Sequence, residues 1–151
     1  MFKRLTIAIC VFSAVLFSSG CASNLNNERA LLTPGSDISH IKTIYVVTQP
    51  RDTHGIDKLI HDKLVAMGYS VMVGPEKPLP YNSDAVVTYR DKWFWDMSMY
   101  LLQLIVTVRN PSDNFPLAVG DSLHWGLYKI SPPEMVNEVV TNIFEASNSK
   151  S

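Results

Sequence analysis

The first half of the chain switches between strand-like and helix-like spacings of its apolar residues. Residues 41–48 (IKTIYVVT) are rich in β-branched and aromatic side chains, which predicts a strand. Residues 56–67 carry apolar side chains at positions that share one face of an α-helix: Ile56, Leu59, Ile60, Leu64 and Met67. Asp52 or Thr53 can cap the start of this helix, and Gly68 suits a left-handed position after its end. Residues 69–73 then predict a short second strand.

In the second half the spacing becomes that of a sheet. Residues 85–92 are extended in pattern, and residues 100–109 alternate, with four side chains on one face: Leu102, Leu104, Val106 and Val108. Such a strand buries one face under helices. Residues 110–114 (NPSDN) have the composition of a turn, and residues 116–129 predict the partner strand, with Gly120 as a bulge.

A second helix is predicted after this strand. Ser131 is a suitable N-cap, Pro132 stands at the first helical position, and Glu134 follows three residues after the cap. Together, the elements have the order β-α-β-β-β-β-α. This order predicts an α+β fold, a two-layer sandwich in which a mostly antiparallel sheet of about five strands carries two helices on one face.

The N-terminal segment has a different character. Residues 1–4 include two basic side chains, residues 5–17 form an apolar run too short to span a bilayer, and small residues then precede Cys21. This pattern predicts a signal peptide over residues 1–20. The sequence around Cys21 resembles the lipobox of bacterial lipoproteins, although Ser18 stands where leucine is most often found. The resemblance implies cleavage before Cys21 and acylation of that cysteine; the alternative is an ordinary signal peptide with a coincidental cysteine.

The remaining chain divides into three expected parts. Residues 21–36 are polar, contain a Pro-Gly turn and predict a lipidated flexible tether. Residues 37–147 predict a single α+β domain in the periplasm, and residues 148–151 a frayed tail. Ala22 follows the cysteine, whereas lipoproteins retained at the inner membrane of enteric bacteria resemble Cys-Asp there. The analogy therefore implies transport to the outer membrane, with the domain facing the periplasm.

Composition narrows the possible functions. Loss of Lys3 and Arg4 with the signal peptide would leave 11 basic and 14 acidic side chains, a net charge near −3. Such a surface does not favour nucleic acid as a partner. The other cysteine, Cys10, lies inside the signal peptide, so the mature chain has no disulfide and no thiolate zinc site.

The stretch Tyr89 to Leu104 (YRDKWFWDMSMYLLQL) is the candidate binding site. Trp93 and Trp95 should point to one side of a strand and Phe94 to the other. One interpretation is an aromatic platform for a sugar ring or a cation, with Asp91 or Asp96 accepting hydrogen bonds. The other is that the indoles close the end of a small core.

The remaining polar residues form no recognisable catalytic pattern. His54 and His61 are two helical turns apart, too far to chelate one ion, although Asp57 could pair with His61; His124 with Trp125 suggests a surface pair on a strand. Nucleophile elbows, phosphate loops and zinc-protease motifs are absent from the sequence. We therefore expect no catalytic residue, no metal and no cofactor.

The W-x-W-D-M stretch, the alternating strand after it and the Met-Val-rich C-terminal helix resemble a group of small lipobox-containing lipoproteins of Gram-negative bacteria, a family of unknown function. The resemblance implies fold and anchoring. We expect a non-catalytic envelope lipoprotein, held in the lipid bilayer through acylated Cys21, that binds or assists assembly of another envelope protein. The alternatives are a glycan or small-ligand module that uses the Trp93/Trp95 corner, and an enzyme without a recognisable motif.

Overall fold

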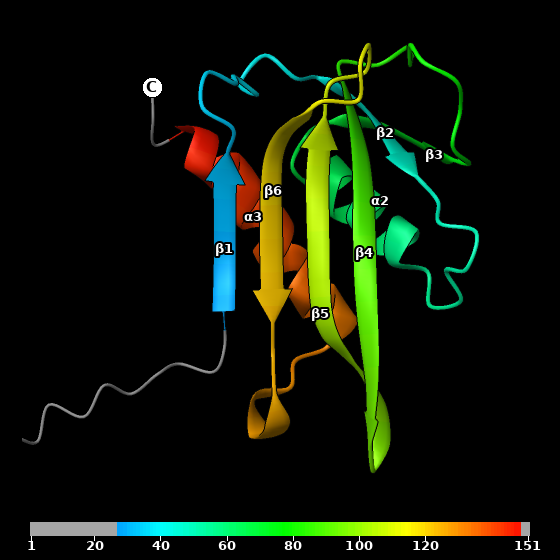
Figure 1. Cartoon of the computed structure of the whole chain (residues 1–151), viewed down its shortest axis with the longest axis vertical. Helices are drawn as coiled ribbons and strands as arrows, with labels where there is room; N and C mark the ends of the chain where they lie inside the picture. Colours follow the sequence, from blue (N-terminus) through cyan, green and yellow to red (C-terminus); the bar gives the residue numbers. More distant parts are fainter. Residues whose placement is uncertain (1–26, 149–151) are drawn as a thin grey trace, which may run out of the picture.

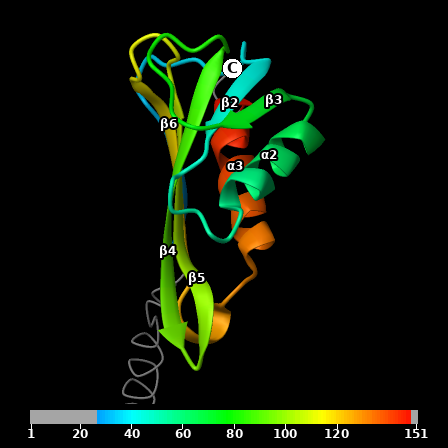
Figure 2. The same cartoon turned by 90° about the vertical axis from the view of Figure 1, so that its right-hand side faces the viewer.

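The computed structural model describes residues 27–148, which form two layers: a six-stranded sheet and two helices on one of its faces (Figure 1, Figure 2). The strands are β1 (Asn27–Leu32), β2 (Thr43–Val47), β3 (Ser70–Gly74), β4 (Ala85–Asp96), β5 (Ser98–Arg109) and β6 (Pro116–Leu123), and the helices are α2 (Ile56–Ala66) and α3 (Pro132–Asn148). The predicted α+β sandwich is therefore confirmed, as is the order of its elements from β2 onward.

The sheet is mostly antiparallel, as predicted, with a parallel part at one edge and six strands instead of about five. Its strand order is β1-β6-β5-β4-β2-β3. The four strands from β1 to β4 in this order pair antiparallel, whereas β2 pairs parallel with both β4 and β3. The parallel part arises because α2 connects β2 to β3 and returns the chain to the same end of the sheet.

A sixth strand lies where the flexible tether was predicted. β1 pairs antiparallel with β6, and Ala30 and Leu32 pack against the core while Leu31 points to solvent. Two inward positions are too few to stand out as an alternating pattern in a sequence. The first part of the predicted tether, residues 21–26 with Cys21, lies outside the described residues, as do the signal peptide and residues 149–151.

Local hydrogen bonds explain where both helices begin. The carboxylate of Asp52 accepts the backbone N–H groups of Gly55 at 2.7 Å and Asp57 at 3.1 Å, so Asp52 rather than Thr53 provides the predicted cap of α2. At α3, Glu134 accepts the backbone N–H and the hydroxyl of Ser131, both at 2.7 Å, and so reaches back to the residue before the helix as predicted.

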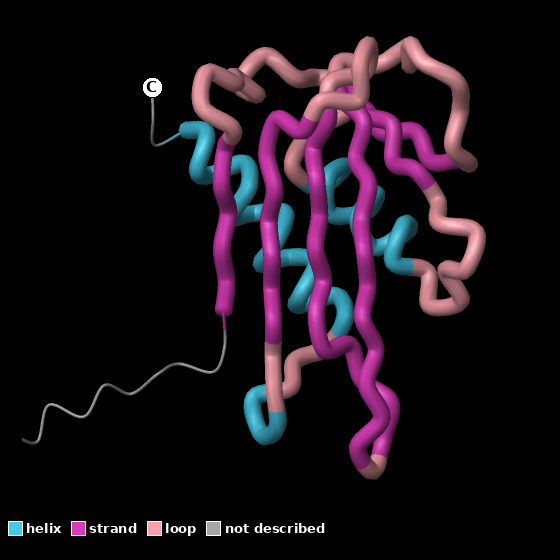
Figure 3. The backbone as a smooth tube through the Cα atoms, in the orientation of Figure 1, coloured by secondary structure: helices cyan, strands magenta, loops and turns pink. Residues whose placement is uncertain are grey.

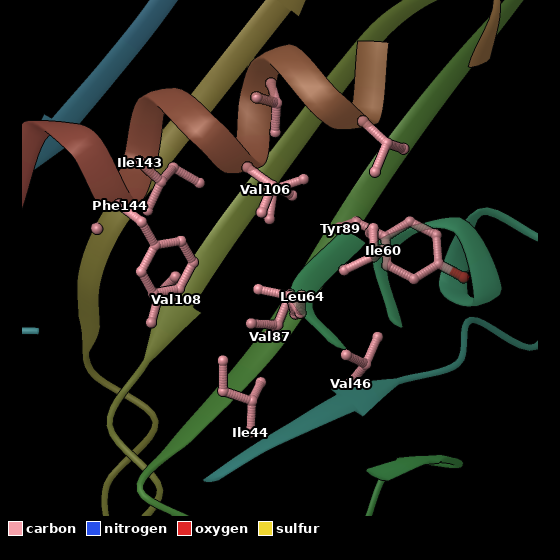
Figure 4. Packing of buried hydrophobic residues seen from close by; sticks show 14 of the residues in the cluster. Ile44, Val46, Ile60, Leu64, Val87, Tyr89, Val106, Val108, Ile143 and Phe144 are labelled. Atoms are coloured by element: carbon pink, nitrogen blue, oxygen red, sulfur yellow. The ribbon is translucent and has the colours of Figure 1, made fainter. Parts of the chain in front are cut away.

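The core lies between the helices and the sheet. Ile60 and Leu64 of α2 and Ile143 and Phe144 of α3 face strand residues that include Val46, Val87 and Val106 (Figure 4). Gly120 faces α3 at close range: a Cβ there would lie 2.8 Å from side-chain carbons of Ile143. The predicted bulge at Gly120 is therefore wrong, and the residue is needed instead for the close approach of α3 to β6.

Two irregularities in the β5 and β6 region differ from the sequence pattern. The register between β4 and β5 shifts at Lys92/Trp93, which leaves Leu102 as an extra residue on β5. Leu101 consequently joins Leu104 in the core, in the place that alternation predicted for Leu102. β6 ends at Leu123 rather than at residue 129, and a 3-10 helix, η1 (Gly126–Tyr128), follows it.

The two ends of the sheet are built differently. Connecting loops that include residues 75–84 and 110–115 lie at one end, whereas the β4–β5 hairpin and η1 project from the other end (Figure 1, Figure 3). Within residues 27–148, neither helix has the length and apolar character needed to cross a membrane.

Candidate functional site

The two tryptophans of the predicted site have different surroundings. Trp93 is half-buried against the core, and its ring stacks on His54 with centroids 3.7 Å apart. Its indole N–H donates to Asp91 at 2.6 Å. Trp95 is 68% exposed. Because His54 occupies a face of Trp93, the two indoles do not form one open platform, and the arrangement does not favour the glycan-binding alternative.

Trp95 belongs to a larger apolar surface at the hairpin end. Met97, 93% exposed, lies at the turn of the hairpin, and Leu127 of η1 is fully exposed. Phe94 contacts Trp125 with ring centroids 6.0 Å apart, so the hairpin and the segment around η1 touch. We call this surface the hairpin-end patch; its members are Phe94, Trp95, Met97, Met99, Trp125, Leu127 and Tyr128.

An ion pair also links these two segments. The Lys129 ammonium lies 3.5 Å from the Asp96 carboxylate and 4.1 Å above the ring centre of Tyr100. Asp96 therefore pairs with a lysine, while Asp91 binds Trp93; the four predicted site residues lie in two separate small clusters. The sequence pattern predicts a strand over residues 125–128 and does not reveal their place in the patch, although Gly126 before two large apolar residues was an available signal.

A cleft of about 660 Å³ lies near the opposite end of the sheet. Val86 and Thr88 of β4 line it together with Pro75, Pro78 and Leu79 of the loop after β3. These residues gave no recognisable pattern in the sequence beyond the prolines of the loop. The size and the mainly apolar lining are those of ligand-binding clefts.

Aromatic side chains hold the loop in place over the sheet. The Tyr45 hydroxyl donates to the carbonyl of Pro75 at 2.9 Å, and the Tyr81 backbone N–H donates to the carbonyl of Pro111 at 2.9 Å. The Lys77 ammonium lies 4.4 Å above the ring centre of Tyr45. The cleft is therefore a preformed feature of the fold.

A polar network borders the cleft. The Tyr89 hydroxyl donates to Asp52 at 2.6 Å, and the Gln49 side-chain amide donates to the carbonyl of Tyr89. Burial raises the pKa of Tyr89, and the adjacent Asp52 carboxylate raises it further, so the hydroxyl stays protonated. Burial alone would raise the pKa of Asp52, but the hydrogen bonds from Tyr89 and from three backbone N–H groups outweigh it and lower that pKa. The network holds the α2 cap against β4 and does not present a reactive group.

A buried histidine lies between β6 and α3. His124 is 3% exposed, which corrects the prediction of a surface pair with Trp125. Its Nε2 lies 2.9 Å from the Glu138 carboxylate, which also accepts the Ser122 hydroxyl at 3.0 Å. Because Ser122 donates to the carboxylate and not to the imidazole, the trio lacks the serine–histidine contact of an activated nucleophile.

The described residues contain no group of three histidine, cysteine or acidic side chains that could hold a metal ion. His61 contacts Asp62 at 2.8 Å rather than the predicted Asp57, whose carboxylate instead accepts the Thr48 hydroxyl at 2.7 Å. His54 is stacked on Trp93. The contacts of Asp57 with Thr48 and of His54 with Trp93 therefore hold the start of α2 in place.

Comparison with known proteins identifies the fold alone. No protein-family model matches the sequence, and no curated protein matches it. Among solved structures, the chain is similar to the PelC dodecamer from Paraburkholderia phytofirmans, with a TM-score of 0.58 and 12% identity over 78% of this chain and 97% of that one. A point variant of the same dodecamer gives a TM-score of 0.59 at 14% identity, over 78% of this chain and 96% of that one.

Proposed function

We propose that this chain is a non-catalytic lipoprotein of the cell envelope, anchored through Cys21 at the outer membrane and facing the periplasm, which binds an extended segment of another envelope protein. The cleft beneath residues 75–81 carries this proposal. It has the volume of a binding site, an apolar floor and a few polar groups at its border. Two of its lining hydroxyls bind carboxylates, Thr48 to Asp57 and Tyr89 to Asp52, and both pairs hold the start of α2.

The surroundings of the cleft indicate the chemistry of the bound segment. An adjoining hollow of about 350 Å³ is lined by Arg90 and Arg109, and it shares Glu76 and Thr88 with the cleft. An apolar side chain of the partner would enter the cleft, and a neighbouring carboxylate would meet the guanidinium groups in the hollow. The two PelC structures similar to this chain are dodecamers, so a second copy of this chain is included among the candidate partners.

The proposal can be tested by co-purification from membranes in mild detergent, with a tag at the C-terminus. Leu79, which lines the cleft and is exposed, is replaced in Leu79→Glu; Val65, exposed on α2 away from the cleft, is replaced in the matched control Val65→Glu. We expect wild type and the control to recover the same partner, and recovery by Leu79→Glu to fall at least tenfold.

Recovery of the same partner by all three proteins would contradict the role of the cleft. Thermal melting of the purified variants checks their folding, because substitutions at exposed positions usually change stability by less than about 0.5 kcal/mol.

A further inference from the structure

The hairpin-end patch is too large and too exposed to be explained by packing within the chain. It holds seven of the thirteen exposed large apolar side chains among the described residues. Exposed large apolar side chains gathered at one end of a fold mark an interaction surface. The hairpin-end patch shares no residue with the cleft. The partner of the patch is therefore inferred from other observations.

The register of the sheet places the start of the described chain at the same end as the patch. Asn27 pairs with Leu123, and Leu123 also pairs with Gln103 of β5. From this level the hairpin continues for six more residues along β5 to Met97. At the rise of a strand this is about 20 Å, so the patch projects about that far beyond Asn27 (Figure 1, Figure 2).

The chain between Asn27 and Cys21 has the same reach. Six residue-to-residue steps also separate these two residues, and they span at most about 22 Å when fully extended. Acyl chains on Cys21 would therefore hold Asn27 within about 22 Å of the membrane. In an upright orientation of the domain, the hairpin would contact the bilayer surface even with that segment fully extended.

The side chains of the patch have the chemistry of a membrane interface. Trp95, Trp125 and Tyr128 are amphipathic aromatics, which are enriched at the level of lipid headgroups. Met97 and Leu127 are exposed apolar side chains on projecting turns, where they can enter the acyl region. Lys129, beside the patch, pairs with Asp96 and so offsets the negative charge of that hairpin residue.

We propose that the hairpin-end patch inserts into the interface of the bilayer that holds the acylated Cys21, so that the domain stands on the membrane with the cleft directed away from it. The proposal rests on the lipid anchor of the proposed function. It adds a second membrane contact to the lipid chains, and it gives the domain a defined orientation. A single acyl chain alone gives only marginal membrane binding, so a second contact strengthens the attachment.

A fluorescent probe at the hairpin tip can test this in the lipidated full-length protein reconstituted into phosphatidylcholine–phosphatidylethanolamine vesicles. An environment-sensitive fluorophore is attached in Met97→Cys, and in a control, Asp113→Cys, at the turn at the opposite end. We expect blue-shifted emission and quenching by a lipid-borne spin label at position 97 only. Trp95→Ser with Leu127→Ser should reduce both effects, whereas Met72→Ser with Val65→Ser, at exposed positions outside the cleft and the patch, should preserve them.

The results separate the anchor from the patch. Loss of vesicle binding, with no acylation in the mass spectrum, would refute the anchor and with it the orientation proposed here. A vesicle-bound protein whose probe at position 97 stays in water would overturn the patch proposal alone. Shielding of that probe in native membrane fragments but not in pure lipid would also overturn it, and would assign the patch to a protein partner.

Discussion

Trp93 and Trp95 lie two positions apart on β4, yet their surroundings differ. Alternation along β4 predicts both indoles on one side of the strand, and therefore similar surroundings for the two. In the structure, Trp93 lies between His54 and the core with its N–H bonded to Asp91, while Trp95, near the end of β4, is mostly exposed. The difference arises because β4 is longer than the helical layer that covers it (Figure 2).

We therefore predict different stabilities for the two alanine variants. Trp93→Ala should cost about 1–3 kcal/mol of unfolding free energy, less than the roughly 3–5 kcal/mol of a fully buried tryptophan because the ring is half-buried. Trp95→Ala should change it by less than about 0.5 kcal/mol. Urea denaturation of both variants measures this, and equal losses would contradict the environments described.

Asp52 gives a pH-dependent contribution to stability. Its pKa is lower in the folded protein than in the unfolded chain, so folding favours the ionised carboxylate. The contribution is therefore fully present above the ordinary aspartate value of 3.8 and is lost as the pH falls below it.

At pH 7, Asp52→Asn should accordingly have a lower urea midpoint than wild type. Near pH 3, the midpoints of the two proteins should be close. Glu145→Gln, which removes an exposed carboxylate on α3, serves as the control and should follow wild type at both values. An Asp52→Asn midpoint that differs from wild type equally at pH 7 and pH 3 would show that the carboxylate charge has no part in the cap.

At the scale of elements, the contact between β6 and α3 depends on a glycine, a residue without a Cβ. Gly120 faces Ile143 and the carbonyl of Val139, and a Cβ at that position would lie 3.2 Å from this carbonyl oxygen. The glycine thus lets the helix approach the strand closely. A pattern of apolar residues contains no information about this distance, which explains why Gly120 suggested a bulge.

Gly120→Ala should destabilise the protein by about 1–3 kcal/mol, the usual cost of overpacking a core. Shortening the opposing side chain should relieve part of the clash with Ile143, so Gly120→Ala combined with Ile143→Val should lose less than the sum of the two single variants. Thermal melts of the four proteins form a double-mutant cycle. Strict additivity would show that the two residues are not in contact.

At the scale of the whole molecule, the two ends of the sheet suggest separate tasks. The cleft and the loops around residues 75–81 lie toward one end, and the hairpin-end patch lies at the other, where β1 begins. Anchoring near β1 would present the cleft to the periplasm. The orientation of the domain is therefore expected to follow from the hairpin-end patch together with the short distance in sequence between Cys21 and β1.

Cys21→Ser tests the anchor. If Cys21 is acylated, wild-type protein should fractionate with membranes and incorporate labelled palmitate, whereas the variant should remain uncleaved or become soluble. Density-gradient fractionation should place the wild type in the outer membrane, as Ala22 after the cysteine implies. Unchanged fractionation of the variant without any incorporated label in wild type would refute lipidation.

Local patterns in the sequence determined the elements with a clear period or a clear cap. Both helices, the cap at Asp52 and the Ser131–Glu134 pair could be predicted because each depends on residues within a few positions of one another. The α+β layers followed from the order of these elements. The candidate site was recognised only as an aromatic stretch, without its division between Trp93 and Trp95.

Only the tertiary structure decided the features that depend on contacts between distant segments. β1 is a strand because β6 offers it an edge, and the extra residue at Leu102 is visible only in its register with β4. The cleft joins β4 to a loop, and the patch joins the hairpin to η1. Such contacts bring together residues whose spacing along the chain has no period, so the pattern of apolar positions could not reveal them.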